Sequence, residues 1–297
     1  MLAYITWNAD PILLRLGELR IGWYGLLLAG GFLLAYMLFH KITTREGFPE
    51  KLGDRFAICL ILWTIVGLRL GHCLFYEWNS YFKYHILEIF IPFVETANGW
   101  KFTGYAGLAS HGGVVAILCY VLWFTYKHRA VNMLWLMDRL AIAIPLAAAF
   151  VRCGNLMNSE IIGTVTTQPW GFIFMQLEGN GTDECCEPRH PAQLYEAFVY
   201  LCLFFFQVWH YFRRTKGRIP PGRTSGITLC TVFIARFIIE FFKKEQVDFE
   251  KSMLLDMGQL LSIPFILIGF GLLIYSFRKK DCIAKPMRTD TTKPNQA

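Results

Sequence analysis

The chain has 297 residues, of which 55% are hydrophobic, 16% are aromatic and only 17% are charged. This composition is typical of a polytopic membrane protein and excludes an ordinary soluble domain. Because the formal net charge of +7 comes without an interleaved basic and aromatic patch, we expect no nucleic-acid partner.

Seven apolar runs of about 20 residues, the length that crosses about 30 Å of hydrocarbon, follow one another along the chain. They predict an all-α membrane domain of seven transmembrane helices over 1–278 and a disordered cytoplasmic tail over 279–297. We find no cleavable signal and expect the first span to stay as an anchor. The predicted spans lie near 21–40, 56–76, 107–126, 133–151, 192–212, 225–242 and 259–277.

The distribution of Lys and Arg predicts the orientation, because basic residues accumulate on the cytoplasmic side of a membrane. They gather after the first, third and fifth spans and in the tail, which places the amino terminus outside and the carboxyl terminus inside. The residues that carry this bias are Lys41, Arg45, Lys51, Arg55, Lys127, Arg129, Arg213, Arg214, Lys216, Arg218, Arg223, Arg278, Lys279, Lys280, Lys285, Arg288 and Lys293.

Two predicted outer connections are too long to be simple turns. The segment 77–106 is rich in aromatic residues, which predicts an arm at the membrane interface. The segment 157–191 is rich in Gly and Pro, which predicts an extended or hairpin cap over an outer cavity. Five cysteines lie singly in the spans and are expected to be small core residues, whereas the role of Cys185 and Cys186 stays open.

Four arginines, Arg69, Arg139, Arg152 and Arg236, lie inside the apolar runs. An unpaired arginine at the centre of a membrane helix costs at least ~2.5 to 3.5 kcal/mol, so such residues usually face a protein interior and serve a function. For Arg69, both an anion contact and a helix-packing anchor remain open.

The densest polar cluster follows Arg152 at the outer end of the fourth span. Arg152 and Asn155 are three residues apart on one helical face, and Gly154 between them permits a close backbone approach or a change of direction. An arginine with amide neighbours suits a phosphate, because its planar fork donates two hydrogen bonds at once. The alternative is an internal salt bridge between Arg152 and Glu160.

In the sixth span, Arg236, Glu240 and Lys243 are spaced four and then three residues apart, which places them on one helical face. Glu240 can orient Arg236 while the remaining donors of the arginine point at a ligand. The alternative is a purely structural ion pair, although an isolated buried pair seldom repays its desolvation.

Two further polar groups begin spans at the outer side. His111 precedes Gly112 and Gly113, and its ordinary pKa near 6.5 suits a general base, although a hydrogen-bonded core histidine is equally consistent with the pattern. Gln193 and Glu196 are three residues apart at the start of the fifth span, where they either contribute to a site or satisfy free backbone N–H groups.

Taken together, the motifs resemble the bacterial prolipoprotein diacylglyceryl transferase family. The resemblance extends from about Trp23 to Pro264, and its arginine-glycine-asparagine stretch is the most specific part. The motifs are Trp23-Tyr24-Gly25, His111-Gly112-Gly113, Arg152-x-Gly154-Asn155-x-x-Asn158-x-Glu160, His190-Pro-Ala-Gln-Leu-Tyr-Glu196, Arg236-Phe-x-x-Glu240 and Met257-Gly-Gln-x-x-Ser262-x-Pro264.

The resemblance implies a multi-pass enzyme of the bacterial inner membrane. Such an enzyme transfers the diacylglyceryl group of phosphatidylglycerol to the lipobox cysteine thiol in the signal peptide of a preprolipoprotein. A thioether forms and glycerol phosphate is released, in the first step of lipoprotein maturation. The implied partners are phosphatidylglycerol, the signal peptide and membrane lipids, and no metal or organic cofactor is required.

In the family, the residues that match Arg152 and Arg236 are essential and the one that matches His111 is an important, basic residue. We therefore predict catalytic roles for His111, Arg152 and Arg236. The predicted substrate-binding residues are Tyr24, Arg69, Gly112, Gly113, Asn155, Asn158, Glu160, Gln193, Glu196, Glu240 and Lys243.

Two positions depart from the family pattern. Lys243 stands where many members have arginine, which removes the bidentate fork, and Ser159 replaces the usual glycine before the glutamate. One rival interpretation is a transporter or receptor that binds an anionic phospholipid without chemistry. Another is a lipid-head transferase with a different acceptor.

Overall fold

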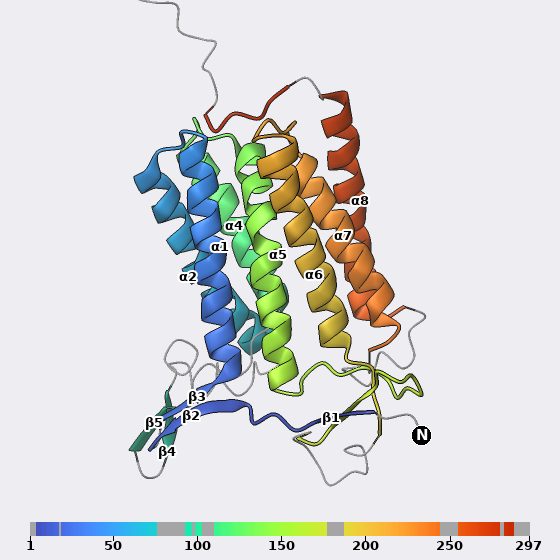
Figure 1. The fold of residues 1–297 in the computed structure, drawn as a ribbon. Coiled ribbons are helices and arrows are strands. Elements are labelled where there is room, and N and C mark those ends of the chain that lie inside the picture. Colours follow the sequence, from blue (N-terminus) through green and yellow to red (C-terminus); the bar gives the residue numbers. More distant parts are fainter. Residues whose placement is uncertain are drawn as a thin grey trace, which may run out of the picture. The chain divides into compact units, whose positions relative to one another are not determined.

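The computed structural model describes residues 4–17, 19–75, 93–96, 99–102, 110–176, 187–243, 255–279 and 282–287. Their contacts divide the chain into two compact units. Unit 1 comprises Met1–Arg15, Arg20–Phe39 and Leu134–Ala284, and unit 2 comprises Leu16–Leu19, His40–Met133 and Lys285–Ala297. Most of the described residues are helical, as the sequence predicts (Figure 1).

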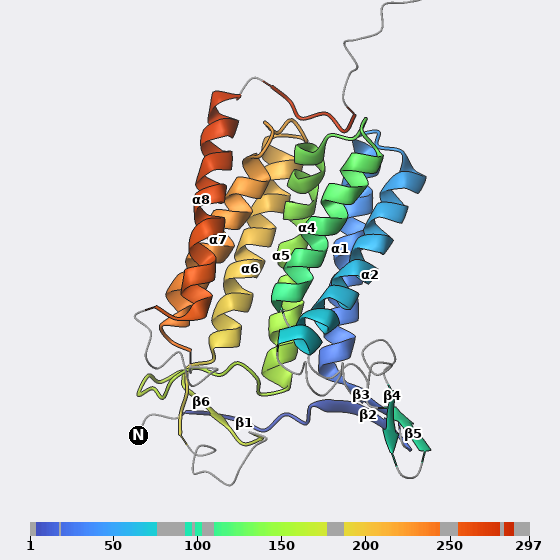
Figure 2. The same ribbon diagram turned by 180° about the vertical axis from the view of Figure 1, so that it is seen from behind.

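Four long helices of unit 1 lie side by side in chain order in both views (Figures 1 and 2). These are α5 (Met133–Met157), α6 (Ala192–Trp209), which continues into the π-helical turn η3 (His210–Arg214), α7 (Arg223–Glu240) and α8 (Met257–Arg278). Helix α6 packs on α7, and α7 packs on α8. Helix α1 (Trp23–Arg45) approaches α5 closely, because Gly31 lies against the ring of Phe150.

Short strands lie at the end of unit 1 where α5 ends and α6 begins (Figure 1). Strand β1 (Ile5–Trp7) pairs in parallel with β6 (Phe172–Phe174), in the register Ile5 to Phe172 and Trp7 to Phe174. Strand β2 (Ile12–Leu16) pairs with β3 (Leu19–Gly22), which leads directly into α1. The predicted extended cap over 157–191 therefore contains β6, and β6 is joined to the amino-terminal segment.

A buried carboxylate of α5 caps the start of α7 at the opposite end of unit 1. Gly222, the residue before α7, has a φ of 81° and no side chain that could cap the helix. Asp138 takes this role instead, because its two oxygens accept the N–H groups of Gly222 at 2.7 Å and Ser225 at 2.9 Å. The carboxylate also lies where the positive end of the α7 dipole favours a negative charge.

Arg139, which follows this aspartate, belongs to the same end of the unit. It is fully buried, and its guanidinium carbon lies 5.3 Å from the ring centroid of Trp135 and 6.0 Å from that of Tyr211. Aromatic faces attract a guanidinium in this geometry. Of the four arginines in apolar runs, Arg139 is therefore engaged in packing of unit 1.

In unit 2, α2 (Glu50–Phe75) packs on α4 (Ser110–Lys127). The two helices approach so closely that a Cβ atom on Gly112 would lie 2.1 Å from the carbonyl oxygen of Gly67. Strands β4 (Phe93–Thr96) and β5 (Gly99–Phe102) form an antiparallel hairpin within the predicted outer arm. The remainder of that arm lies outside the described residues.

Five helices in the described part of the chain are long and apolar enough to cross a membrane: Trp23–Arg45, Glu50–Leu74, Met133–Met157, Ala192–Arg214 and Met257–Arg278. They correspond to five of the seven predicted spans. The third predicted span contains the shorter apolar helix Gly112–Lys127. The sixth corresponds to α7, whose 18 residues include Arg223, Arg236 and Glu240 and which is therefore less apolar than the others.

Of the five cysteines in the spans, Cys73 and Cys230 are buried and Cys59 is half-buried, as expected for core residues. Cys119 and Cys202 are exposed on their helices, so the expectation that they are core residues is wrong. Cys185 and Cys186 lie outside the described part. Of the predicted tail, only 282–287 is described apart from Lys279, and there the Ala284 N–H donates to the Ile219 carbonyl at 3.2 Å. The prediction of disorder for the rest of the tail falls on residues that are not described.

Candidate functional site

The carboxyl-terminal end of α5 closes with a Schellman motif, the turn in which the chain reverses after a helix. The N–H of Glu160 donates to the carbonyl oxygen of Asn155 at 2.9 Å, and the N–H of Ser159 donates to that of Leu156 at 3.0 Å. This turn brings the side chain of the residue after the left-handed position back over the last helical turn. In this chain it brings Glu160 over Asn155.

Glu160 is fixed through all of its polar groups. Its carboxylate accepts hydrogen bonds from Asn155 Nδ2 at 3.1 Å and Asn158 Nδ2 at 3.0 Å. Its backbone carbonyl accepts a hydrogen bond from Gln193 Nε2 of α6. Asn155 also accepts a hydrogen bond from Arg152 Nη1 at 3.1 Å through its Oδ1, so one amide links the arginine to the carboxylate.

The left-handed residue of this motif supports a prediction about stability. Ser159 has a φ of 55°, where L-residues other than glycine cost about 1 kcal/mol. We expect Ser159→Gly to raise the free energy of unfolding by up to about 1 kcal/mol, partly offset by the greater freedom of glycine in the unfolded chain. Thermal unfolding in detergent measures this change. Ser159→Ala is the control and should give no gain, because alanine meets the same steric conflict; equal stabilisation by both variants would contradict the explanation.

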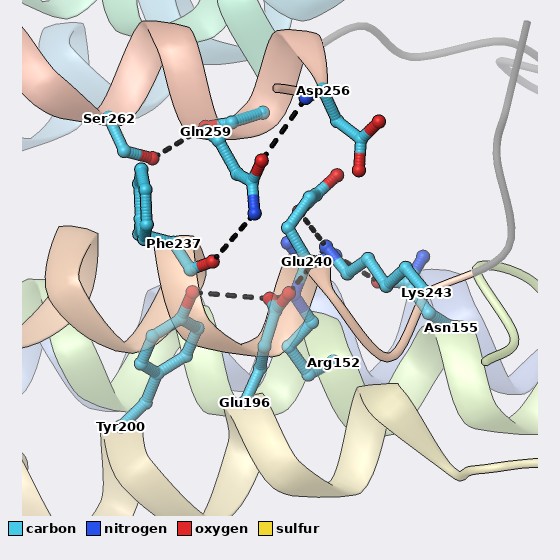
Figure 3. A network of polar contacts seen from close by, with 11 residues as sticks. Arg152, Asn155, Glu196, Tyr200, Phe237, Glu240, Lys243, Asp256, Gln259 and Ser262 are labelled. Carbon is cyan, nitrogen blue, oxygen red and sulfur yellow. Dashed lines mark hydrogen bonds and ion pairs between the residues drawn. The ribbon is translucent and has the colours of Figure 1, made fainter. Parts of the chain in front are cut away.

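Glu196 of α6 lies at the centre of the polar network in Figure 3. Its side chain is only 1% exposed. One carboxylate oxygen, Oε2, pairs with Arg152 Nε and accepts the hydroxyl hydrogen of Tyr200 at 3.2 Å. The other oxygen, Oε1, lies 2.6 Å from Lys243 Nζ. One buried carboxylate thus pairs with Arg152 of α5 and with Lys243, which lies just after α7.

Glu240 completes this network from α7 (Figure 3). Its Oε2 pairs with Lys243 Nζ at 3.0 Å, and its carboxyl group rests against Gly258 at the start of α8. Asp256 and Gln259 form a capping box there, and Gln259 Nε2 also donates to the Phe237 carbonyl of α7 at 3.3 Å. The start of α8 is therefore fastened beside Glu240, where its positive dipole end stabilises the carboxylate.

Arg236 is a cation of this region that makes no ion pair within the described part of the chain. Its side chain is half-buried on α7, four residues before Glu240. Among the residues that the structure describes, none forms a hydrogen bond or ion pair with it. It is nevertheless close enough to Glu196 and Tyr200 to contribute to their electrostatic environment. Within the described part of the chain, the arrangement therefore offers one guanidinium without an ion pair, next to a group of four side chains, Arg152, Glu196, Lys243 and Glu240, whose charges balance.

The structure differs from two ion pairs that sequence spacing suggests. Arg152 pairs with Glu196 of a neighbouring helix, whereas the link to Glu160 runs through Asn155. Glu240 pairs with Lys243, and Arg236 is not its partner. In the first case the closer partner comes from α6, and in the second it is Lys243, three residues after Glu240. Gln193 and Glu196 likewise bond to other segments, so satisfying N–H groups at their own helix start is not their role.

Tyr24 and Gly154 lie together in unit 1. A Cβ atom on Gly154 would come within 2.8 Å of the Tyr24 ring, which confirms the expected close approach at this glycine. Tyr200, which joins Glu196 one helical turn later on α6, is missing from the residues predicted for the site. Its i, i+4 spacing from Glu196 is the sequence signal that could have identified it.

A connected hydrogen-bond chain lies beside the network. Tyr195 Oη accepts the indole N–H of Trp170 at 2.8 Å and lies 2.9 Å from His190 Nδ1. Burial lowers the pKa of His190, which favours the neutral imidazole. The backbone of His190 also bonds to Gly163 and Thr164, so it fixes the start of the loop after Glu160.

The remaining predicted site residues belong to unit 2. Arg69 is 6% exposed on α2. Gly112 and Gly113 serve the packing of α4, because they face Gly67 and Leu68 of α2. His111 lies in the first turn of α4, but its side chain is outside the described part, so its predicted role stays a prediction. Within the described residues, no group of three His, Cys, Asp or Glu side chains is placed to hold a metal ion.

Comparisons with known proteins agree on one family. A family model for prolipoprotein diacylglyceryl transferase matches residues 11–275. The chain is 41% identical over 281 residues to the phosphatidylglycerol–prolipoprotein diacylglyceryl transferase of Bacteroides fragilis, covering 94% of this chain and 98% of that protein. It is 42% identical over 276 residues to the protein of the same name from Tolumonas auensis, covering 93% and 99%. The chain therefore belongs to the prolipoprotein diacylglyceryl transferase family.

Proposed function

We propose that the chain transfers the diacylglyceryl group of phosphatidylglycerol to the lipobox cysteine of a prolipoprotein. The cysteine thiolate attacks the glyceryl carbon, a carbon–sulfur bond forms, and the carbon–oxygen bond to the phosphate breaks. Glycerol phosphate leaves with the electron pair of that bond, and the thiol proton goes to a base. Family membership and the names of the relatives support this reaction.

The availability of Arg236 is the observation that carries this proposal. Arg152 and Lys243 are matched by Glu196 and Glu240, so these four side chains are neutral as a group. Arg236 adds a positive charge that makes no ion pair with any described residue. The negative charge of a phosphodiester can pair with this guanidinium. The negative charge on the departing phosphate increases as the carbon–oxygen bond breaks. In this proposal Arg236 binds the donor and stabilises the transition state.

The acceptor thiol needs activation, because an ordinary cysteine pKa of about 8.5 leaves little thiolate at neutral pH. We assign the base to His111, and the field of Arg152 and Arg236 favours the thiolate further. In this proposal Asn155, Asn158 and Glu160 contact the polar head of the lipid. Tyr24, Gln193, Glu240 and Lys243 hold that arrangement, and Arg69, Gly112 and Gly113 contribute from α2 and α4.

The same proposal includes the membrane arrangement. Helices α4 and α7 supply the two further spans, which gives seven in a single domain over 1–278 of the inner membrane. The amino terminus then lies outside and the carboxyl-terminal tail inside. The charges that make α7 less apolar than its neighbours include Arg236 and Glu240, so its lower hydropathy follows from the site that it carries.

Release of glycerol phosphate from phosphatidylglycerol by the purified protein in detergent tests the reaction. We expect release only when a peptide with the lipobox cysteine is present, together with a thioether-linked lipid on that peptide. A peptide with serine in place of the cysteine is the matched control. Binding of phosphatidylglycerol without release would support a phospholipid transporter or receptor instead, and release with the serine peptide would indicate a different acceptor.

The contact between Gly258 and Glu240 gives a second prediction. A Cβ atom at position 258 would lie 2.5 Å from the carboxyl carbon of Glu240. Because the obstacle is the end of a flexible side chain, we expect Gly258→Ala to fold normally but to displace Glu240 from Lys243. The kcat/KM for phosphatidylglycerol should fall by about tenfold, the effect of losing one charge-assisted contact.

Gly271→Ala is the matched control in the same helix. No atom lies within 4 Å of the position that its Cβ would occupy. Alanine favours helix by up to about 1 kcal/mol over glycine, so this variant should be slightly stabilised and fully active. Full activity of Gly258→Ala would show that the Glu240–Lys243 contact is not required.

A further inference from the structure

A tryptophan near the amino terminus reaches the helix end that carries the candidate site. The indole Nε1 of Trp7 on β1 donates a hydrogen bond to the Leu156 carbonyl of α5 at 3.0 Å. These residues are far apart in sequence and are brought together by the parallel pairing of β1 with β6. The contact lies one residue from Asn155, which links Arg152 to Glu160.

The carbonyl that Trp7 contacts is part of the Schellman motif. The oxygen of Leu156 also accepts the N–H of Ser159, and its two lone pairs allow both hydrogen bonds. Ser159 stands in the left-handed conformation that turns the chain toward Glu160. A donor from outside the helix thus completes the turn that positions the Glu160 carboxylate.

Trp7 is itself held on two sides. Its ring lies 5.8 Å from that of Phe172, and it packs against the buried cluster of Leu156 and Phe174. Its backbone carbonyl accepts the N–H of Met175 at 2.9 Å. Packing and the strand pair therefore fix the direction of the indole N–H, so its hydrogen bond to Leu156 holds the end of α5 in place.

We propose that Trp7 is a positioning residue for the phospholipid site. It acts through the end of α5, because it keeps Asn155 and Glu160 in the arrangement that faces Arg152. Strand β1 then supports the geometry of the site, although none of its groups contacts the substrate in this proposal. This inference rests on the proposed transferase function for its kinetic consequence, whereas its structural consequence is independent of activity.

Trp7→Phe tests the role of the hydrogen bond from Trp7 to Leu156, because phenylalanine keeps an aromatic ring against Phe172 and removes the N–H. We expect kcat/KM for phosphatidylglycerol to fall by about tenfold, the usual effect of losing one hydrogen bond. In a Glu160→Gln background, the same substitution should add little, because its effect passes through Glu160. Asn8→Ala is the matched control: it removes the exposed hydrogen bond from Gln176 Nε2 to Asn8 Oδ1, next to Trp7 in the sequence, and should leave kcat/KM unchanged.

Hydrogen exchange provides a second measurement that needs no turnover. The N–H groups of Ser159 and Glu160 should exchange faster in Trp7→Phe than in the native chain or in Asn8→Ala. If Trp7→Phe does not fold, Phe172→Leu loosens the indole without removing its N–H and should give a smaller change of the same kind. Unchanged exchange at Ser159 and Glu160, or full additivity with Glu160→Gln, would overturn the proposal. A native chain that shows protected amides but no transfer would refute the proposed function and leave the structural role of this hydrogen bond intact.

Discussion

Arg236→Ala is expected to reduce cysteine-dependent release of glycerol phosphate by about 1,000-fold, the effect of removing a preorganised donor from a developing anionic charge. The fold should tolerate the change, because among the described residues Arg236 has no ion pair or hydrogen bond to lose. Removing an unmatched charge from an apolar helix also favours insertion. Single-turnover kinetics with purified protein, together with thermal unfolding, separate the two consequences.

Arg236→Lys and Arg223→Ala are the controls for this prediction. Lysine keeps the charge but loses the bidentate fork, so its activity should lie between those of the native and alanine variants. Arg223 is on the same helix, about 20 Å from Arg236 at 1.5 Å per residue, and donates to Ser276 Oγ at 3.1 Å. Arg223→Ala should keep its activity. Substantial turnover in Arg236→Ala would remove this residue from the mechanism.

The helices were predictable because apolar runs of bilayer length leave few alternatives for the backbone. The polar residues of the site were predictable for a related reason, since a charge such as Arg152 or Glu240 in these runs is costly unless it has partners or a function. Spacing within one helical face predicted some of the partners, because Asn155 contacts Arg152 and Lys243 contacts Glu240 at three residues apart. It did not predict that Glu196 of a separate helix pairs with Arg152.

Contacts between distant segments were not predictable from the sequence. Strand β1 has three residues, and nothing in their pattern indicates pairing with Phe172 or a bond from Trp7 to α5. Asp138 is a single acidic residue in an apolar run, and the backbone N–H groups that satisfy it belong to a helix start far along the chain. Such pairings depend on tertiary packing, which local propensity does not encode.

The Schellman motif at the end of α5 was predictable only in part. The sequence shows a polar stretch after Gly154 but no glycine at the left-handed position, where Ser159 stands instead. A helix end was therefore visible only as a loss of apolar periodicity. The hydrophobic contact that usually accompanies this motif is replaced by the hydrogen bond between Asn155 and Glu160, so the sequence signature was absent while the geometry was kept.

Glu196→Ala is expected to have the largest effect on stability. Its side chain is 1% exposed and forms ion pairs with both Arg152 and Lys243, whose side chains are 12% and 4% exposed. Removing one partner leaves buried charge uncompensated, which typically costs about 3 to 5 kcal/mol. We therefore expect a large fall in the thermal unfolding temperature and loss of transfer activity.

Two substitutions distinguish this explanation from a general sensitivity of the region. Glu196→Gln preserves the shape and an acceptor for Tyr200 but removes the charge, so it should destabilise the protein less than alanine while still impairing transfer. Arg15→Ala removes one partner of the Arg15–Asp10 pair, whose side chains are 61% and 45% exposed, and exposed ion pairs contribute at most about 1 kcal/mol. If Glu196→Ala unfolded no more easily than Arg15→Ala, Glu196 would not be the residue that joins α5, α6 and Lys243 just after α7. The orientation of Arg152 would then have to come from Asn155 alone.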